Sequence, residues 1–506
     1  MRFSRSSGIL LHPTSLPGPY GIGDLGPAAH RFADFLHDSG QRIWQVLPLG
    51  PTGYGDSPYQ CFSAFAGNPM LVSLDALAER GYLAARDLSE RPQFPADKVD
   101  FGAVIAWKMP LLRAAYQGFR RSRPAGHEDF DAFCRTHSSW LDEYALFMAL
   151  KEVHNNVMWT RWERELALRE PGAMDRVRSE LCEEIECHKF IQFEFERQWH
   201  ELKHHCRRND VHILGDMPIY VALDSADVWA DPELFELDER GQPRVVAGVP
   251  PDYFSATGQL WGNPIYRWEA HAKTGYGWWI ARFRRALEFL DMIRLDHFRG
   301  FEAYYEVPGG DKTAANGTWV KGPGAPLFEA LQQALGELPI VAENLGVITR
   351  EVEALRHQFE YPGMAILQFA FGKDPQAPNF KPHNYERDLV AYTGTHDNDT
   401  VLGWWNSSGA GDSTRTPEDV AKEMEFARCY LNTDGREINW TMIRTLMASV
   451  ADTVLFPVQD VLGVGSEGRM NLPGTPSGNW RWRVREEALT SAIGARLRQL
   501  VETYDR

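Results

Sequence analysis

The sequence predicts an α/β fold, a (β/α)8 barrel of the TIM type with an inserted helical subdomain and large loops on one face. Eight short apolar runs recur along the 506 residues, each ending at polar residues, glycine or proline, and helix-like segments lie between several of them. Continuous apolar runs are typical of strands buried on both faces of a parallel sheet. Eight such strands alternating with helices favour a closed barrel, with a doubly wound open sheet as the alternative.

The eight predicted strands are GILLH (8–12), IWQVLPL (43–49), VHILGD (211–216), FLDMIRLD (289–296), LPIVAEN (338–344), MAILQFAF (364–371), LVAYTGTHD (389–397) and DTVLFPVQD (452–460). Helices are predicted between strands at 27–40, 325–337 and 441–451. The first has Pro27 at its start and Gly40 at its end, the usual positions of these residues at helix boundaries. We therefore predict a single barrel domain over residues 1–506.

Two intervals between predicted strands are too long for a plain crossover. Residues 75–205 are mostly helix-like and charged, with the clearest helix at 184–206, so we predict an inserted, mainly helical subdomain. Residues 222–285 look irregular and are rich in proline, glycine and aromatic residues. Long loops of this kind are usually functional or disordered, and the aromatic content argues against disorder. We predict an insertion on the active face, with a lid loop at 250–264.

Composition excludes several classes of protein. The formal net charge of −16 gives no sign of the basic patch that nucleic-acid binders carry. The apolar run near the N-terminus is too short for a signal peptide, and no run approaches the length of a membrane span. Six scattered cysteines suggest reduced thiols in a cytoplasmic protein. We expect no metal site and no cofactor, and either a monomer or a simple homodimer.

Carboxylates follow four of the apolar runs, at Asp216, Asp296, Glu343 and Asp397. An acid at the end of one strand is commonly a solvated start of a loop. In a barrel, however, the ends of all strands meet at one face, which is where barrel enzymes hold their catalytic groups. Four acids at matching positions therefore predict a site.

Two of these carboxylates have contrasting surroundings. Arg294 lies two residues before Asp296, so both side chains share one face of the strand, and the arginine favours the ionised carboxylate. A structural ion pair at the barrel rim is the alternative. Glu343 follows three apolar residues, and partial desolvation would raise its pKa so that it delivers a proton near neutrality. Paired carboxyl groups whose pKa values are pushed apart are typical of glycoside cleavage.

Aromatic residues strengthen the interpretation that a sugar binds here. The loop 250–264 offers Tyr253, Phe254 and Trp261, and the loop 53–69 offers Tyr59. Sugar rings have apolar faces that pack on aromatic rings, while their hydroxyls need polar partners such as His396, which adjoins Asp397. These aromatics could instead anchor their loops to the core.

The motifs extend along nearly the whole chain: SGILLHPTSLPGPYGIGDLG, WQVLPLGPTGYGDSPYQ, GDMPIYV, GVPPDYFSATGQLWGNPIY, IRLDHFRGF, AENLG, GTHDNDT, PVQDVLG and RMNLPGTPSGNWRWR. In these segments the sequence resembles the 4-α-glucanotransferases of the amylomaltase or disproportionating-enzyme type, glycoside hydrolase family seventy-seven. The resemblance implies that Asp296 is the nucleophile, Glu343 the acid/base and Asp397 the stabiliser of the transition state. It further implies a set of sugar-binding residues: Ser57, Tyr59, Asp216, Asp252, Phe254, Trp261, Arg294, His396 and Asn471.

The function implied by this resemblance is transfer of α-1,4-glucan segments by retaining double displacement, without a cofactor. The donor would be a maltooligosaccharide or a starch-type glucan, and the acceptor the 4-hydroxyl of glucose or of another glucan. An amylase-type α-glucan hydrolase is the alternative, because it shares the same intermediate. GIGDLG (21–26) fits the G-x-G-x-x-G pattern of nucleotide-binding oxidoreductases, but GILLH ends about ten residues before the first glycine, which is too far for that motif. The carboxylate set argues against a noncatalytic glucan-binding module.

Overall fold

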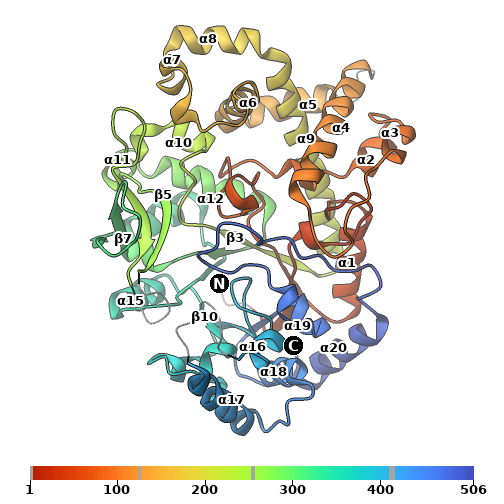
Figure 1. The fold of residues 1–506 in the computed structure, drawn as a ribbon, viewed down its shortest axis with the longest axis vertical. Coiled ribbons are helices and arrows are strands. Elements are labelled where there is room, and N and C mark those ends of the chain that lie inside the picture. Colours follow the sequence, from red (N-terminus) through yellow and green to blue (C-terminus); the bar gives the residue numbers. More distant parts are fainter. Residues whose placement is uncertain (1–3, 123–126, 252–256, 409–415) are drawn as a thin grey trace.

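The computed structural model describes residues 4–122, 127–251, 257–408 and 416–506. Eight parallel strands form its central sheet (Figure 1). They are β1 (Ser6–Leu10), β2 (Ile43–Gln45), β3 (His212–Met217), β6 (Met292–Leu295), β9 (Ile340–Ala342), β10 (Gly363–Ile366), β11 (Leu389–Tyr392) and β12 (Thr453–Pro457). Each of the eight predicted runs overlaps one of these strands.

The strands follow one another around the sheet in chain order, with β1 between β12 and β2. The two end strands, β9 and β10, approach each other, because the Ala342 N–H donates to the Pro362 carbonyl across 2.9 Å. This contact makes the sheet a nearly closed barrel. The barrel prediction is confirmed, and the doubly wound alternative is wrong, since a doubly wound sheet reverses its strand order at a switch point.

Apolar side chains fill the interior of the barrel, contributed by seven of the strands: Ile43, Leu214, Met292, Val341, Met364, Ile366, Val390, Tyr392 and Leu455. β1 supplies Gly8 instead, where an added Cβ would lie 2.2 Å from the Ile43 carbonyl oxygen. Because side chains two apart share a face of a strand, Asp216, Arg294 and Glu343 lie one layer above Leu214, Met292 and Val341. The inner face of the barrel thus changes from apolar to charged at one end.

Helices cover the outside of the barrel (Figure 1). They include α1 (Pro27–Asp38), α12 (Gly277–Phe289), α13 (Arg299–Glu302), α14 (Ala325–Leu335), α15 (Arg350–Gln358), α16 (Val401–Trp405), α17 (Pro417–Leu431), α18 (Ile438–Met447), α19 (Val458–Leu462) and α20 (Ser491–Tyr504). The predicted helices at 27–40 and 325–337 match α1 and α14. The third begins three residues earlier and ends four residues earlier than predicted, because α18 buries Ile438 and Asn439 in its first turn.

The interval between β2 and β3 is helical, and Figure 1 shows it above the barrel. Its helices are α2 (Leu74–Glu79), α3 (Ala85–Ser89), α4 (Phe101–Arg121), α5 (His127–Thr136), α6 (Ser138–Val153), α7 (Arg164–Ala167), α8 (Pro171–Glu180) and α9 (Cys182–Arg208). α9 packs on α1, α4, α5, α6 and α8, so one long helix joins this region to the barrel wall.

The expectation of irregular structure over 222–285 is wrong for much of that segment. It contains α10 (Ala226–Ala230), β4 (Val245–Val249), β5 (Gln259–Pro264), α11 (Trp268–Lys273) and the start of α12. β4 and β5 join β7 (Ala303–Pro308) and β8 (Thr318–Lys321) in an antiparallel sheet of order β5-β4-β7-β8. Pairing between β4 and a strand about sixty residues later leaves no local signal in the sequence. Trp261 consequently lies on a strand, whereas the sequence placed it in a loop.

The GIGDLG segment leads directly into α1, with Gly26 as its N-cap residue. Asp24 accepts a hydrogen bond of 3.0 Å from the Gly26 N–H. An added Cβ at Gly23 would lie 2.0 Å from the Pro13 carbonyl oxygen, so close backbone packing explains this glycine. Within the described ranges, no helix combines the length and the apolar character that crossing a membrane requires.

Candidate active site

The site begins with an arginine between two carboxylates at the ends of adjacent strands. Arg294 on β6 donates from Nη1 to both oxygens of Asp216 on β3, at 2.8 Å each. The same nitrogen donates to Oδ1 of Asp296 at 2.9 Å. β3 and β6 are paired with Asp216 opposite Arg294, which brings these groups together. The predicted pairing of Arg294 with Asp296 is confirmed, and Asp216 joins it.

Burial and charge act in opposite directions on this cluster. Burial alone would lower the pKa of Arg294, but the carboxylates of Asp216 and Asp296 raise it well above its usual value. Burial raises the pKa of Asp216, and the guanidinium of Arg294 opposes that rise. The side chain of Asp296 remains 25% exposed. A fixed cation thus holds Asp296 in place while one side of its carboxyl group stays accessible.

Glu343 follows β9 and is buried against the same cluster. Its Oε2 accepts from the His297 N–H at 2.8 Å, and its Oε1 accepts from the Leu345 N–H at 2.9 Å. Burial raises its pKa to about 7, Arg294 acts against the rise, and the charge of Asp296 adds to it. The predicted upward shift is therefore confirmed, and Glu343 can exchange a proton near neutral pH.

His297 supports Glu343 through its backbone rather than its ring. Its φ of 49° lies in the left-handed region, a strained backbone that is common at functional sites. Its ring packs edge-on against Trp261, with centroids 4.8 Å apart. Burial, with a smaller effect of Arg299, lowers the pKa of the ring to about 3, so it is neutral. Trp261 on β5 is thereby held next to the residue that positions Glu343.

A second group of residues is built around Tyr59. Its hydroxyl donates to Oδ2 of Asp216 at 2.7 Å, and its ring stacks on His396 with centroids 5.1 Å apart. Trp480 contacts both rings, at 5.7 Å from Tyr59 and 5.8 Å from His396. Ser57 shapes this loop, because its Oγ accepts from the Tyr59 N–H at 3.2 Å.

Asp397 lies on a loop and not at a strand end, which corrects the prediction. β11 ends at Tyr392, and residues 393–400 connect it to α16. The side chain of Asp397 is 46% exposed. Its Oδ1 accepts from the Asn471 amide at 2.6 Å, and the Asn471 N–H donates to the His396 carbonyl at 3.0 Å. Asn471 therefore holds the third carboxylate.

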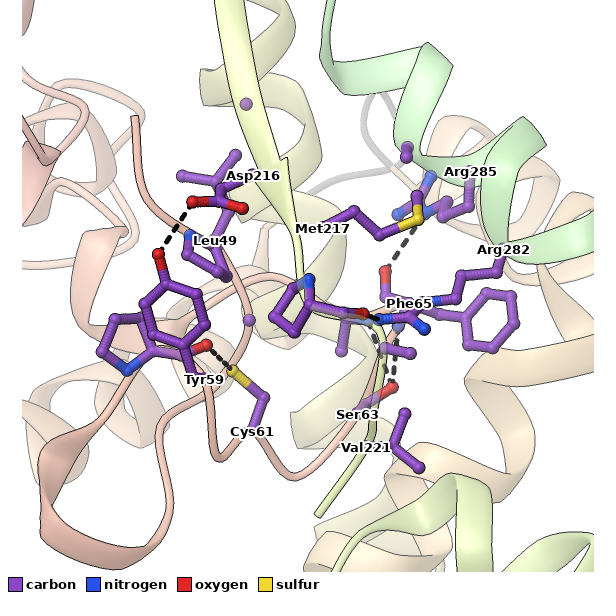
Figure 2. A pocket seen from close by; sticks show the side chains of 18 of the residues that line it. Leu49, Tyr59, Cys61, Ser63, Phe65, Asp216, Met217, Val221, Arg282 and Arg285 are labelled. Atoms are coloured by element: carbon purple, nitrogen blue, oxygen red, sulfur yellow. Dashed lines mark hydrogen bonds between the residues drawn. The ribbon is translucent and has the colours of Figure 1, made fainter. Parts of the chain in front are cut away.

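A pocket that is partly open to solvent adjoins this site (Figure 2). Figure 2 shows Tyr59 and Asp216 at one end and Arg282 and Arg285 at the other. Arg282 donates to the Pro218 carbonyl at 2.6 Å, and Arg285 donates to the Phe65 carbonyl at 3.2 Å. These arginines hold the segments that follow β2 and β3, and both segments line the pocket.

The described residues include ten of the twelve predicted site residues, and Asp252 and Phe254 fall outside them.

Sequence reasoning missed Trp480 and His12 as site residues. His12 is buried just beyond β1, and burial together with His396 lowers its pKa to about 3. It follows an apolar run, so the rule that selected the four acids could have selected it. Trp480 lies within the quoted RMNLPGTPSGNWRWR motif.

A family model described as 4-alpha-glucanotransferase matches residues 11–490. The chain belongs to this 4-α-glucanotransferase family. A 4-alpha-glucanotransferase of Thermus thermophilus is 52% identical over 515 residues, covering 100% of both chains. That of Synechocystis sp. is 51% identical over 99% of this chain and 98% of its own. A chloroplastic/amyloplastic member of the family from Solanum tuberosum is 43% identical over 99% and 86%.

One solved structure agrees with the family assignment, and a second matches the fold. The amylomaltase from Streptococcus agalactiae in complex with acarbose matches with a TM-score of 0.94 and 39% identity, over 99% of both chains. The amylomaltase from Corynebacterium glutamicum matches with a TM-score of 0.81 at 19% identity, over 98% of this chain and 75% of that one. The second likeness concerns the fold alone.

Proposed function

We propose that this protein transfers α-1,4-glucan segments from a maltooligosaccharide or starch-type donor to the 4-hydroxyl of glucose or of another glucan. Membership of the 4-α-glucanotransferase family supports the class of reaction. The observation that carries the mechanism is the contrast between two neighbouring carboxyl groups. Asp296 accepts from the guanidinium of Arg294, while burial raises the pKa of Glu343 to about 7. One group is suited to be a charged nucleophile and the other a proton donor.

In the first step, Glu343 protonates the leaving glycosidic oxygen while a carboxylate oxygen of Asp296 attacks the anomeric carbon. The carbon–oxygen bond to the leaving glucan breaks, and a covalent β-glucosyl ester forms on Asp296. In the second step, Glu343 removes the proton from the 4-hydroxyl of the acceptor. That oxygen displaces Asp296 and restores an α-1,4 bond. Two inversions return the original configuration, and neither step needs a cofactor.

The remaining groups surround the reacting sugar in this proposal. Asp397 would stabilise the positive charge that develops at the anomeric carbon. Tyr59 would pack on the sugar bound beside Asp296, with His396 and Asp216 nearby to meet its hydroxyls. Trp261, next to His297, would contact the acceptor. The ring contacts and hydrogen bonds of these residues support such roles, because each is held rigidly by a neighbour.

Incubation with maltotriose tests the proposal directly. We expect a ladder of longer maltooligosaccharides together with glucose, since each catalytic turnover removes a segment from one molecule and adds it to another. Separation of the products by chromatography, with time, would show the ladder. Shortening of maltotriose without longer products would indicate hydrolysis and contradict transfer. An Asp296→Asn preparation serves as the control for contaminating activities.

We also expect kcat/KM for maltotriose to fall as the pH rises above about 7. The reason is that Glu343 must carry a proton to release the leaving group. Since burial raises its pKa, Glu343 is mostly protonated below about 7 and loses the proton above it. In the alkaline range the fall should approach tenfold per pH unit. The measurement is initial rates at low substrate across the neutral range, and a decline already complete near pH 5 would contradict this role for Glu343.

The chain would act as one catalytic unit, with the mainly helical region 75–205 and the segment 222–285 as insertions in the barrel. The contacts of α9 with α1 support this organisation. All six cysteines are unpaired, which is consistent with a reducing compartment such as the cytoplasm.

A further inference from the structure

The loop that carries His396 and Asp397 is held at both of its ends by one buried carboxylate. Asp460 lies in the first turn of α19 and is 2% exposed. Its Oδ2 accepts from the Thr393 hydroxyl at 2.6 Å, where β11 gives way to the loop. Its Oδ1 accepts from the Val401 N–H at 2.7 Å, where α16 begins. The two oxygens therefore join the first residue after β11 to the first residue of α16.

The chain that follows Asp460 holds the middle of the same loop. Ser466 donates from Oγ to Oδ2 of Asp399 at 2.7 Å. Arg469 donates to the Asp397 carbonyl at 2.7 Å, and the Asn471 N–H donates to the His396 carbonyl at 3.0 Å. Residues 460–471, which we term the clamp segment, thus contact the loop at its ends and on both backbone carbonyls of the site residues.

The backbone of Asp460 is itself held by α18. The Asn439 amide on α18 donates to the Asp460 carbonyl at 2.8 Å. Burial raises the pKa of the Asp460 carboxyl to about 6, and the hydrogen bonds from Thr393 and Val401 counteract that rise. A buried carboxyl group is costly unless its oxygens are hydrogen-bonded, and here both are bonded to the ends of the loop. An apolar side chain would avoid that cost, so the carboxylate is best explained by its hold on the loop.

We propose that Asp460 is a positioning residue, which sets the placement of Asp397 and His396 against the reacting sugar by bridging Thr393 and Val401. This inference rests on the proposed function, because it assumes that Asp397 acts in the transition state. Asp460 does not touch the substrate. Its effect is transmitted through the loop, since the half-exposed side chain of Asp397 is positioned by the loop backbone together with its hydrogen bond from Asn471. Displacement of a catalytic group by about 1 Å can reduce turnover about 100-fold.

Asp460→Leu tests the proposal, since leucine has a similar size but accepts no hydrogen bond. We expect kcat for maltotriose to fall about 100-fold with little change in KM. The same loss should appear with α-maltosyl fluoride, whose leaving group needs no protonation, because Asp397 acts with either donor. Asp460→Asn should recover most of the activity, since its amide can accept from Val401 and donate to Thr393 after the hydroxyl rotates.

Two further variants separate positioning from a loss of stability. Gln198 on α9 is buried, and its side-chain oxygen accepts a hydrogen bond of 2.6 Å from the Ser73 N–H. Gln198→Leu should lower the unfolding temperature and leave kcat unchanged. Thr393→Val removes one of the two bonds to Asp460 with little change in shape. Thr393→Val should lower kcat about tenfold. If Asp460→Leu does not fold, Thr393→Val still tests the positioning role of Asp460.

Wild-type kcat in folded Asp460→Leu, or in Thr393→Val, would overturn the inference. Asp397→Ala measured in parallel shows which hypothesis has failed. If Asp397→Ala is inactive while Asp460→Leu turns over normally, the positioning role is wrong and the proposed function stands. If Asp397→Ala itself keeps wild-type turnover, the role proposed for Asp397 is wrong.

Discussion

Replacing Asp296 with asparagine is expected to lower turnover of maltotriose by at least about 1,000-fold and to leave the fold intact. An uncharged amide is a poor nucleophile, so the covalent intermediate no longer forms. The fold should tolerate the change because Arg294 still donates to both oxygens of Asp216. The side chain of Asp296 is also partly exposed. Initial rates and thermal unfolding of the purified variant are the measurements.

A matched variant lies at the other end of the same strand. Asp291 directly precedes β6, where it accepts from the Ile213 N–H at 2.9 Å and pairs with Arg207 at 2.7 Å. Asp291→Asn removes the same charge without reaching the site, so its turnover should stay near that of the wild type. Wild-type turnover in Asp296→Asn would instead refute the nucleophilic role.

The smaller variant Asp296→Ala gives a test of the role itself. With the carboxylate removed, azide can enter the space beside the anomeric carbon and displace fluoride from α-maltosyl fluoride. Attack from the face that Asp296 occupied yields the β-configured azide in a single inversion. Its detection by nuclear magnetic resonance would identify Asp296 as the nucleophile. An α-configured azide would require two inversions, so it would show that another group still forms the intermediate and would contradict the role of Asp296.

Replacing Glu343 with glutamine is expected to lower maltotriose turnover by about 100-fold to 10,000-fold. Glutamine cannot protonate the leaving oxygen, although it keeps the size of the side chain. The donor α-maltosyl fluoride should bypass the defect in the first step, because fluoride departs without a proton. The second step still needs a base, so fluoride release should show a rapid burst followed by a slow phase.

The contrast between donors separates the two carboxyl groups. Glu343→Gln should respond to α-maltosyl fluoride with a burst close to one equivalent of enzyme, whereas Asp296→Asn should release no burst. The alkaline fall in kcat/KM that we assign to Glu343 should also disappear in Glu343→Gln. If Glu343→Gln shows no burst with the fluoride, so that its first turnover is as slow as with maltotriose, Glu343 does not act as the acid.

The barrel was predictable because its strands are buried on both faces, and strands buried in this way consist of continuous apolar runs. The antiparallel sheet was not. β4 pairs with β5, the next element in the chain, and with β7, from which several other elements separate it. The short VVAGV segment has no local feature that indicates these partners. The same limitation placed Trp261 in a loop, although it lies on β5 beside His297.

The candidate site was predictable where it follows from the alternation of side chains along a strand. Arg294 and Asp296 share a face because they are two residues apart, and that spacing alone predicted their contact. The raised pKa of Glu343 followed from the apolar residues before it. Trp480, by contrast, reaches Tyr59 and His396 from more than eighty residues beyond the histidine, and nothing near it in the sequence indicates that contact.

The sequence by itself determined the parallel barrel, the face on which its acids meet, the contact of Arg294 with Asp296 and the raised pKa of Glu343. Each of these depends on local order, because side-chain alternation and flanking apolar residues act within a few positions. Only the tertiary structure decided that Arg294 bridges Asp216 as well as Asp296, and that Asp460 joins both ends of the Asp397 loop. Those contacts form only when barrel closure brings distant segments within hydrogen-bonding distance. A buried charge needs a partner, and here the partners are far from it in the sequence.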